Sequence, residues 1–239
     1  MKRLYIILGG LSALALVVYA LIPDREFKEK LYPISGSAVV MTYDDKIEGG
    51  ASTAGLSIVD STLLFKCKLH PDNTTPAWCG VVWDLDSEKK QRYHNWTFVD
   101  TLILNISSQN IKEILVKVWT YDPDATDPDD FSTFRPLIKE WPLKGGPQRL
   151  AIPMWQLYVP DFWYEEKNVS KRLKQLHQEA VARFEISPSW ETPRDTEFSI
   201  SIQSIEVKGV SNLAFGVILF FFLVVVSIAV GFRHKEKND

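Results

Sequence analysis

The densest set of potential metal ligands in the sequence is an acidic loop, Tyr121-Asp-Pro-Asp-Ala-Thr-Asp-Pro-Asp-Asp130. Its carboxylates offer the oxygen ligands that Ca²⁺ prefers, and the candidate ligands are Asp122, Asp124, Asp127 and Asp129. The loop lacks the glycine and the closing glutamate of an EF-hand loop, and its prolines stiffen it. A solvated acidic turn between two strands is therefore the alternative interpretation.

A second candidate for a calcium site consists of Asp44, Asp45 and Glu48, which directly precede Gly49-Gly50. No motif suggests a cofactor other than calcium.

Aromatic residues suggest a second kind of chemistry, the binding of a flat ligand. Flat amphipathic rings beside polar groups can stack on an apolar ligand face while hydrogen bonds orient it. Any one of these rings could instead pack in the core or on the surface, but as a set they predict a ligand-binding surface. The candidates lie off the apolar register or in loops: Trp78, Tyr93, Trp96, Trp119, Tyr121, Trp155, Trp163 and Tyr164.

The sequence contains no recognisable catalytic motif. There is no G-x-S-x-G, no H-E-x-x-H and no glycine-rich phosphate loop. The histidines His70 and His94 lie in polar, turn-like stretches, where a solvated surface histidine is expected. We therefore predict a non-catalytic protein. A glycosidase-like pair of carboxylates stays open, because the separation that matters for such a pair is spatial.

The two cysteines lie in two runs in which the odd-numbered positions are apolar, Leu63–Leu69 and Trp78–Leu85. If these runs form a hairpin closed by His70–Pro76, Cys67 lies opposite Cys79 and both thiols face the core. In an oxidising compartment, this arrangement predicts a structural disulfide between the two cysteines.

Two uncharged apolar runs flank the rest of the chain. They are Leu4–Ile22 and Leu213–Phe232. At about 1.5 Å per residue, each is long enough to cross the hydrocarbon core of a bilayer as a helix. We therefore predict two transmembrane helices, at 4–22 and 213–232, which makes the lipid bilayer an expected partner.

The charges that flank these runs predict the orientation of the chain. Lys2 and Arg3 precede the first run, and Arg233, Lys235 and Lys237 follow the second. Basic residues stay on the cytoplasmic side, so residues 1–3 and the tail 233–239 are expected to be cytoplasmic. The expected location is a bacterial inner membrane with the main domain periplasmic. As an alternative, the first run with Val18-Tyr19-Ala20 also resembles a cleavable signal peptide rather than an uncleaved anchor.

Between these runs, residues 23–37 read as a charged linker and residues 38–209 as one domain. Short runs with period-two alternation of β-branched and aromatic residues predict strands, and no βαβ alternation is visible. One short helix is expected to begin at Asn168-Val-Ser170 and to continue through Leu176 to Ala180. The fold class is therefore all-β, a sandwich or jelly roll. The expected strands are Leu56–Val59, Thr62–Leu69, Trp78–Leu85, Phe98–Ile106, Glu113–Tyr121, Trp141–Leu143, Arg149–Ile152, Ala182–Ile186 and Glu197–Val207.

Seven segments of this domain carry a family resemblance: Tyr43–Ser52, Leu64–Leu69, Trp78–Leu85, Phe98–Leu104, Val118–Asp122, Val159–Trp163 and Phe198–Glu206. They resemble galactose-binding-like jelly rolls of the carbohydrate-binding-module type, and the last three fit the variant that bacterial membrane sensors hold between two helices. The resemblance covers about residues 38–209 and implies carbohydrate binding. The last strand has Gln203-Ser204 where many relatives carry an acidic residue, which counts against a structural calcium.

Together these features predict a membrane-anchored sensory module that binds a carbohydrate or another small ligand. Only Arg233 to Asp239 follow the second span, so the output is expected to run through a membrane or envelope protein. The net charge of −3 and the lack of a basic stripe argue against a nucleic-acid partner. Two alternatives stay open, an assembly factor of the cell envelope that binds another protein and an enzyme acting on envelope polysaccharide.

Overall fold

The computed structural model describes residues 2–21, 26–34, 36, 38–72, 75–86, 88, 90–170, 175–210 and 212–238. The chain divides into two units, which are described separately. One unit comprises Met1–Lys28 with Lys208–Asp239, and the other comprises Glu29–Val207.

The first unit contains two long helices, α1 (Lys2–Leu21) and α3 (Asn212–Asn238). Both expected spans are therefore helical where the structure describes them, and α3 continues into the segment predicted as a tail. Judged by length and composition, α3 is the one described helix that could cross a membrane, through Ala214–Gly231 with a mean hydropathy of 2.8. The apolar stretch of α1, Tyr5–Leu21, is shorter.

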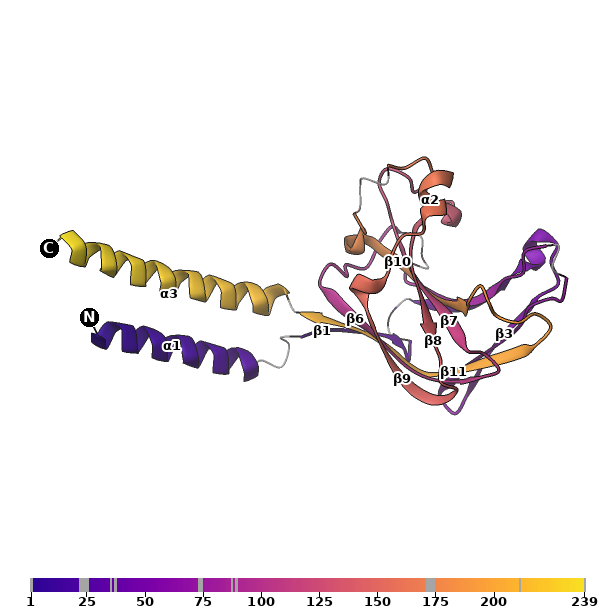
Figure 1. Ribbon diagram of the computed structural model, residues 1–239, viewed down its shortest axis with the longest axis horizontal. Helices are drawn as coiled ribbons and strands as arrows, with labels where there is room; N and C mark the ends of the chain where they lie inside the picture. Colours follow the sequence, from indigo (N-terminus) through magenta and orange to yellow (C-terminus); the bar gives the residue numbers. More distant parts are fainter. Residues whose placement is uncertain are drawn as a thin grey trace. The chain divides into compact units, whose positions relative to one another are not determined.

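The second unit is a sandwich of two antiparallel sheets (Figure 1). Sheet A has the strand order β3-β4-β11-β6-β9, with β1 also paired to β11, and sheet B has the order β2-β5-β10-β7-β8. The strands are β1 (Glu26–Tyr32), β2 (Val39–Asp44), β3 (Thr53–Val59), β4 (Thr62–Lys68), β5 (Cys79–Asp84), β6 (Val99–Gln109), β7 (Glu113–Thr120), β8 (Arg135–Pro142), β9 (Gly146–Pro153), β10 (Val181–Pro188) and β11 (Glu197–Val210). The short helices are η2 (Asp45–Glu48), η3 (Phe131–Thr133), η4 (Met154–Gln156), α2 (Asp161–Glu166) and η5 (Gln178–Ala180).

Period-two alternation places one apolar row of each strand in the core between the sheets. On sheet A, the ring of Phe65 meets Phe198 edge to face at 6.0 Å between centroids. On sheet B, Trp83 packs on Phe184 at 5.4 Å. All four side chains are fully buried, so the inner faces follow the alternation seen in the sequence.

Three predictions of secondary structure need correction. Residues 26–32, predicted as part of a linker, form β1. The prediction missed this strand because its exposed positions carry charges, which hid the alternation with its half-buried positions. The strand expected at Trp141–Leu143 begins much earlier, at Arg135. The prediction missed this start because an arginine and a proline come first, and proline is uncommon in strands. The helix expected at 168–180 lies partly on residues 171–174, which are outside the described residues. Among the described residues of that range, only Gln178–Ala180 are helical, as the short helix η5. The nearest α-helix, α2, ends before it, at Glu166.

The predicted disulfide between Cys67 and Cys79 is confirmed, but its expected setting in a hairpin is wrong. Cys67 is on β4, which pairs with β3 and β11, whereas Cys79 is on β5, which pairs with β2 and β10. The bond therefore joins sheet A to sheet B through the core, where both residues are buried. The alternation in the sequence correctly predicted that both cysteine side chains face the core, but it could not reveal that the two strands belong to different sheets.

Replacing both cysteines by alanine should lower the free energy of unfolding by about 2–5 kcal/mol, as for other native disulfides in small domains. Denaturant unfolding of the full chain should show this loss, and wild-type protein treated with reductant should unfold at the same denaturant concentration as the double variant. Equal stability of oxidised wild type and double variant would contradict a stabilising bridge.

Candidate functional site

The outer face of sheet B, which points away from the core, carries a mixed row of rings and charges. The register of β10 and β7 sets Glu185 beside Lys117 and Arg183 beside Trp119. On the neighbouring strand, Ile138 of β8 lies opposite Lys117. These residues share a face because each is an even number of positions from the next along its own strand.

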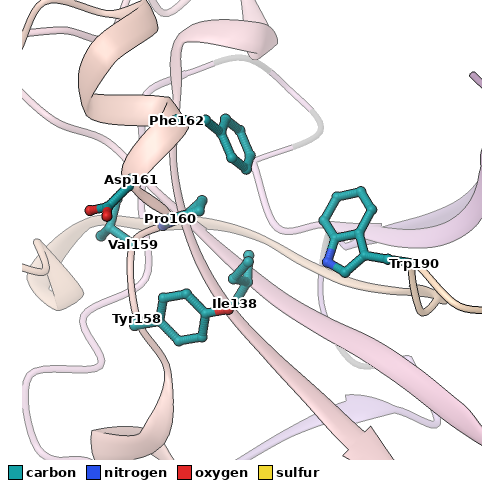
Figure 2. A pocket seen from close by; sticks show the side chains of 7 residues that line it. All are labelled: Ile138, Tyr158, Val159, Pro160, Asp161, Phe162 and Trp190. Atoms are coloured by element: carbon teal, nitrogen blue, oxygen red, sulfur yellow. The ribbon is translucent and has the colours of Figure 1, made fainter.

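Two adjoining cavities lie over this face, and together we call them the groove. The aromatic cavity has a volume of about 600 Å³ and is lined by Ile138, Tyr158, Val159, Pro160, Asp161, Phe162 and Trp190 (Figure 2). The polar cavity, of about 270 Å³, shares Trp190 and extends to Tyr43, Trp78, Lys117, Ser187 and Arg194, among others. Since Trp190 lines both, the groove spans from the β8 edge of the sheet to the β2 edge.

Three rings of the aromatic cavity are open to solvent. Tyr158 is 51% exposed, Phe162 53% and Trp190 67%. Figure 2 shows Phe162, Tyr158 and Trp190 around one opening, with Ile138 between them. Large exposed rings around a concave site are uncommon unless they contact a ligand or partner.

Backbone pairing fixes the wall that carries Tyr158. The amide of Ile138 donates to the carbonyl of Tyr158 at 2.8 Å, and the amide of Tyr158 donates back at 3.1 Å. Tyr158 therefore extends the free edge of β8 by one bridge.

A buried arginine holds the adjoining helix α2 in place. Arg135 is 1% exposed, and its Nε donates to Asp122 Oδ2 at 2.9 Å. Its guanidinium carbon lies 4.8 Å from the ring centre of Trp163 and 5.5 Å from that of Tyr164. With these two rings buried, the preceding residues of α2, Asp161 and Phe162, are left on the groove side.

Glu185 is the polar centre of the outer face. It is 4% exposed and accepts hydrogen bonds from Lys117 Nζ at 2.6 Å, from Trp119 Nε1 at 2.7 Å and from the hydroxyl of Tyr43. Burial of the phenol, together with the negative charge of Glu185, raises the pKa of Tyr43 well above its usual value. Donors from β2 and β7 thus converge on one carboxylate of β10.

The ring of Tyr43 lies directly over Gly80, its partner across the β2–β5 ladder. A Cβ at Gly80 would meet the Tyr43 hydroxyl oxygen at 2.3 Å, so only glycine leaves room for the ring. This close approach sets the height of Tyr43 above the sheet.

The structure distributes the eight predicted aromatic residues over several environments. Trp78 lines the groove, whereas Trp119 donates to Glu185 on the same face of sheet B and does not line either cavity. Trp155 is 78% exposed on η4 and does not line the groove.

The other five serve the core or an aromatic cluster away from the groove. Trp96 and Trp163 are buried and donate to Glu29 and to the carbonyl of Phe134. Tyr164 is also buried against Arg135, as described above. Tyr93 stacks on Tyr121 at 5.1 Å, beside a cavity of only about 30 Å³, which is the share of one water molecule.

The two predicted calcium sites are not assembled as ligand sets. Asp122 is buried against Arg135, whereas the carboxylate of Asp127 caps the amide of Asp129. Asp124 donates its amide to Asp122 Oδ1. Among the residues that the structure describes, no three His, Cys, Asp or Glu side chains are grouped so that they could hold a metal ion.

In the second acidic cluster, protein donors occupy the carboxylates. Asp45 is buried and accepts from the amide of Ser52 at 2.8 Å and from its hydroxyl at 2.6 Å. Asp44 binds the side chain of Lys46, and Glu48 is exposed. His70, which the sequence predicted to be a solvated surface residue, is buried with an exposed fraction of 5%. Its Nε2 lies 3.6 Å from Oδ2 of Asp45.

Solved structures resemble this domain. The family 11 carbohydrate-binding module of the cellulosomal cellulase Lic26A-Cel5E of Clostridium thermocellum matches with a TM-score of 0.54 and 11% identity, over 77% of this chain and 95% of the module. A family 11 module of Clostridium thermocellum in complex with a β-1,3-1,4-mixed-linked tetrasaccharide matches with a TM-score of 0.52 and 11% identity, over 77% of this chain and 96% of that one. The domain therefore has the jelly-roll fold of these modules. No protein-family model and no curated protein matches the sequence.

Sequence reasoning missed the groove residues of this jelly roll that come from loops and from the edge strand, namely Tyr43, Tyr158, Phe162 and Trp190. Trp190 follows Ser-Pro-Ser at the end of β10, and a tryptophan in such a turn was a usable signal. Phe162 was hidden by its neighbour Trp163, because only the turn of α2 determines which of the two faces the groove.

The substitution Asp122→Asn should lower the free energy of unfolding by about 3–5 kcal/mol, because it leaves Arg135 buried without its counter-ion. The exposed control Asp127→Asn should change stability by less than about 0.5 kcal/mol. Denaturant unfolding measures both, and equal effects would contradict the role given to the ion pair.

The substitution Glu185→Gln should lower the pKa of Tyr43, while burial keeps that pKa above its ordinary value of about 10. A raised folded pKa stabilises the fold fully below about pH 10, and this contribution is lost as pH rises through the folded value. Absorbance titration of phenolate, with Tyr43→Phe to assign the signal, measures the shift. An unchanged titration of Tyr43 in the variant would refute the coupling.

Proposed function

We propose that this protein binds an oligosaccharide in the groove on the outer face of sheet B. The observation that carries the proposal is the ring of three half-exposed or exposed aromatic side chains, Tyr158, Phe162 and Trp190, around an open cavity of about 600 Å³. A sugar ring has apolar C–H faces that stack on such rings, while its hydroxyl groups need nearby hydrogen-bonding partners.

The polar cavity supplies those partners. Ser187, Tyr43 and Arg194 are among the residues that line it. The guanidinium group of Arg194 is itself held by the carbonyls of Asp72 and Thr75, with 3.0 Å to the latter. A bound chain would therefore stack at the Trp190 end and form hydrogen bonds toward the β2 edge.

The jelly-roll fold supports this proposal, because the similar family 11 module binds a β-1,3-1,4-mixed-linked tetrasaccharide. At 11% identity the likeness concerns the fold, so the ligand of this chain has to be argued from its own groove. Soluble β-glucans are the first ligands to test.

The proposal places the domain outside the cytoplasm, on a membrane anchor. The apolar run of α3 is long enough to span a bilayer, and the buried disulfide is of the kind that persists in oxidising compartments. The proposed role is non-catalytic sensing, with output through a membrane partner. Ligand can bias such a partner only by binding two states of the protein with different affinity.

Alanine substitutions at Trp190, Tyr158 and Phe162 test the groove. Each should weaken binding of a soluble polysaccharide by about ten-fold or more, since loss of one stacked ring removes about 1.4 kcal/mol. The matched control is Trp155→Ala, which removes an exposed tryptophan outside the groove. Affinities are measured by calorimetry on the full chain in a detergent without a sugar headgroup, against β-glucan, galactan and mannan.

Two results would overturn the proposal. One is a folded wild-type chain that binds none of these polysaccharides, which would favour an envelope assembly factor. The other is binding that Trp155→Ala weakens as much as Trp190→Ala does.

A further inference from the structure

Three donors converge on Glu185, and this geometry has a consequence for the ligand. The Nζ of Lys117 lies 2.6 Å from one carboxylate oxygen and the Nε1 of Trp119 lies 2.7 Å from the other. The hydroxyl of Tyr43 donates to the same oxygen as Lys117. The polar tips of Lys117, Trp119 and Tyr43 are therefore occupied by one acceptor of the protein itself.

Lys117 is the cation of the floor, and Glu185 neutralises it at close range. The lysine side chain is 17% exposed and the glutamate 6%, so water screens this pair less than it would a surface pair. An acidic sugar approaching Lys117 would meet the charge of Glu185 only one hydrogen bond farther away. The two charges largely cancel at the ligand, so an acidic sugar would give up its hydration without a net positive charge to replace it.

The other charges that line the groove, Asp161 and Arg194, offset each other. Asp161, on the wall of the aromatic cavity, is also negative. Arg194, which lines the polar cavity, is positive, and it donates to the main-chain carbonyls of Asp72 and Thr75.

We infer that Glu185 sets the specificity of the groove for uncharged oligosaccharides by occupying Lys117, Trp119 and Tyr43 against acidic ones. This inference rests on the proposed function and deepens it, because it assigns the discrimination between neutral and uronate-bearing chains to one residue. Recognition then depends on ring stacking and on neutral hydroxyl groups.

Matched ligands test the inference. Each neutral polysaccharide, β-glucan, galactan or mannan, is compared with the same polysaccharide after its primary hydroxyl groups have been oxidised to carboxylates. The measured quantity is the ratio of the two affinities for the full chain in detergent. We expect wild type to prefer the neutral form by about ten-fold or more at low salt, with a smaller ratio at high salt.

Glu185→Gln should bring this ratio below about three-fold, because the freed Lys117 then attracts a carboxylate. The control Glu197→Gln removes an equal charge from an exposed position on sheet A and should keep the wild-type ratio. If Glu185→Gln fails to fold, Lys117→Gln provides the opposite test: it leaves Glu185 uncompensated and should increase the ratio.

A wild-type chain that binds oxidised and neutral polysaccharide equally, or prefers the oxidised one, overturns the inference and leaves the proposed function standing. A ratio in Glu185→Gln that matches Glu197→Gln also overturns it. Failure to bind any neutral polysaccharide overturns the proposed function, and the inference with it.

Discussion

Arg135 lies at the start of β8 with its guanidinium group buried between Asp122 and the rings of Trp163 and Tyr164. A buried charge is tolerated only when it is paired and hydrogen-bonded, so this arginine dictates the position of everything around it. The loop after β7 must place Asp122 against the guanidinium group, and α2 must place the rings of Trp163 and Tyr164 on its other side. Because those rings face Arg135, Phe162 and Asp161 face the groove. The wall of the groove is therefore a consequence of satisfying one cation.

A second carboxylate plays a comparable part on the floor of the groove. Glu185 gathers donors from β2 and β7 onto β10, so that three strands present their polar groups at one fixed point. Gly80 makes this possible, because the ring of Tyr43 lies where any other side chain would be. The two ion pairs thus hold helix α2 and the polar side chains of Lys117 and Tyr43 in fixed positions. Preorganisation of this kind lowers the entropy that a ligand must remove on binding.

The likeness to family 11 modules concerns the architecture, and the function rests on the groove of this chain. At 11% identity the likeness shows the fold alone and assigns no role to any ring of this groove. What this groove shares with a sugar-binding site is physical: exposed aromatic rings, neighbouring hydrogen-bond groups and an open shape. The disulfide between the sheets adds stiffness to the scaffold behind it.

The sequence alone determined the properties that depend on local pattern. The alternation of apolar and polar residues predicted most strands and the inward orientation of Cys67 and Cys79. The length of the two apolar runs predicted both long helices. The sequence also led to the all-β fold, and it named Trp78, which lines the groove. Only the tertiary structure decided which strands share a sheet, and hence that the disulfide crosses the core. Likewise, Asp122 reads as a calcium ligand and Trp163 as a sugar platform until Arg135 is seen between them. These assignments depend on partners 13 and 28 residues away in the chain, through pairings that strand order and burial create and that no local pattern contains.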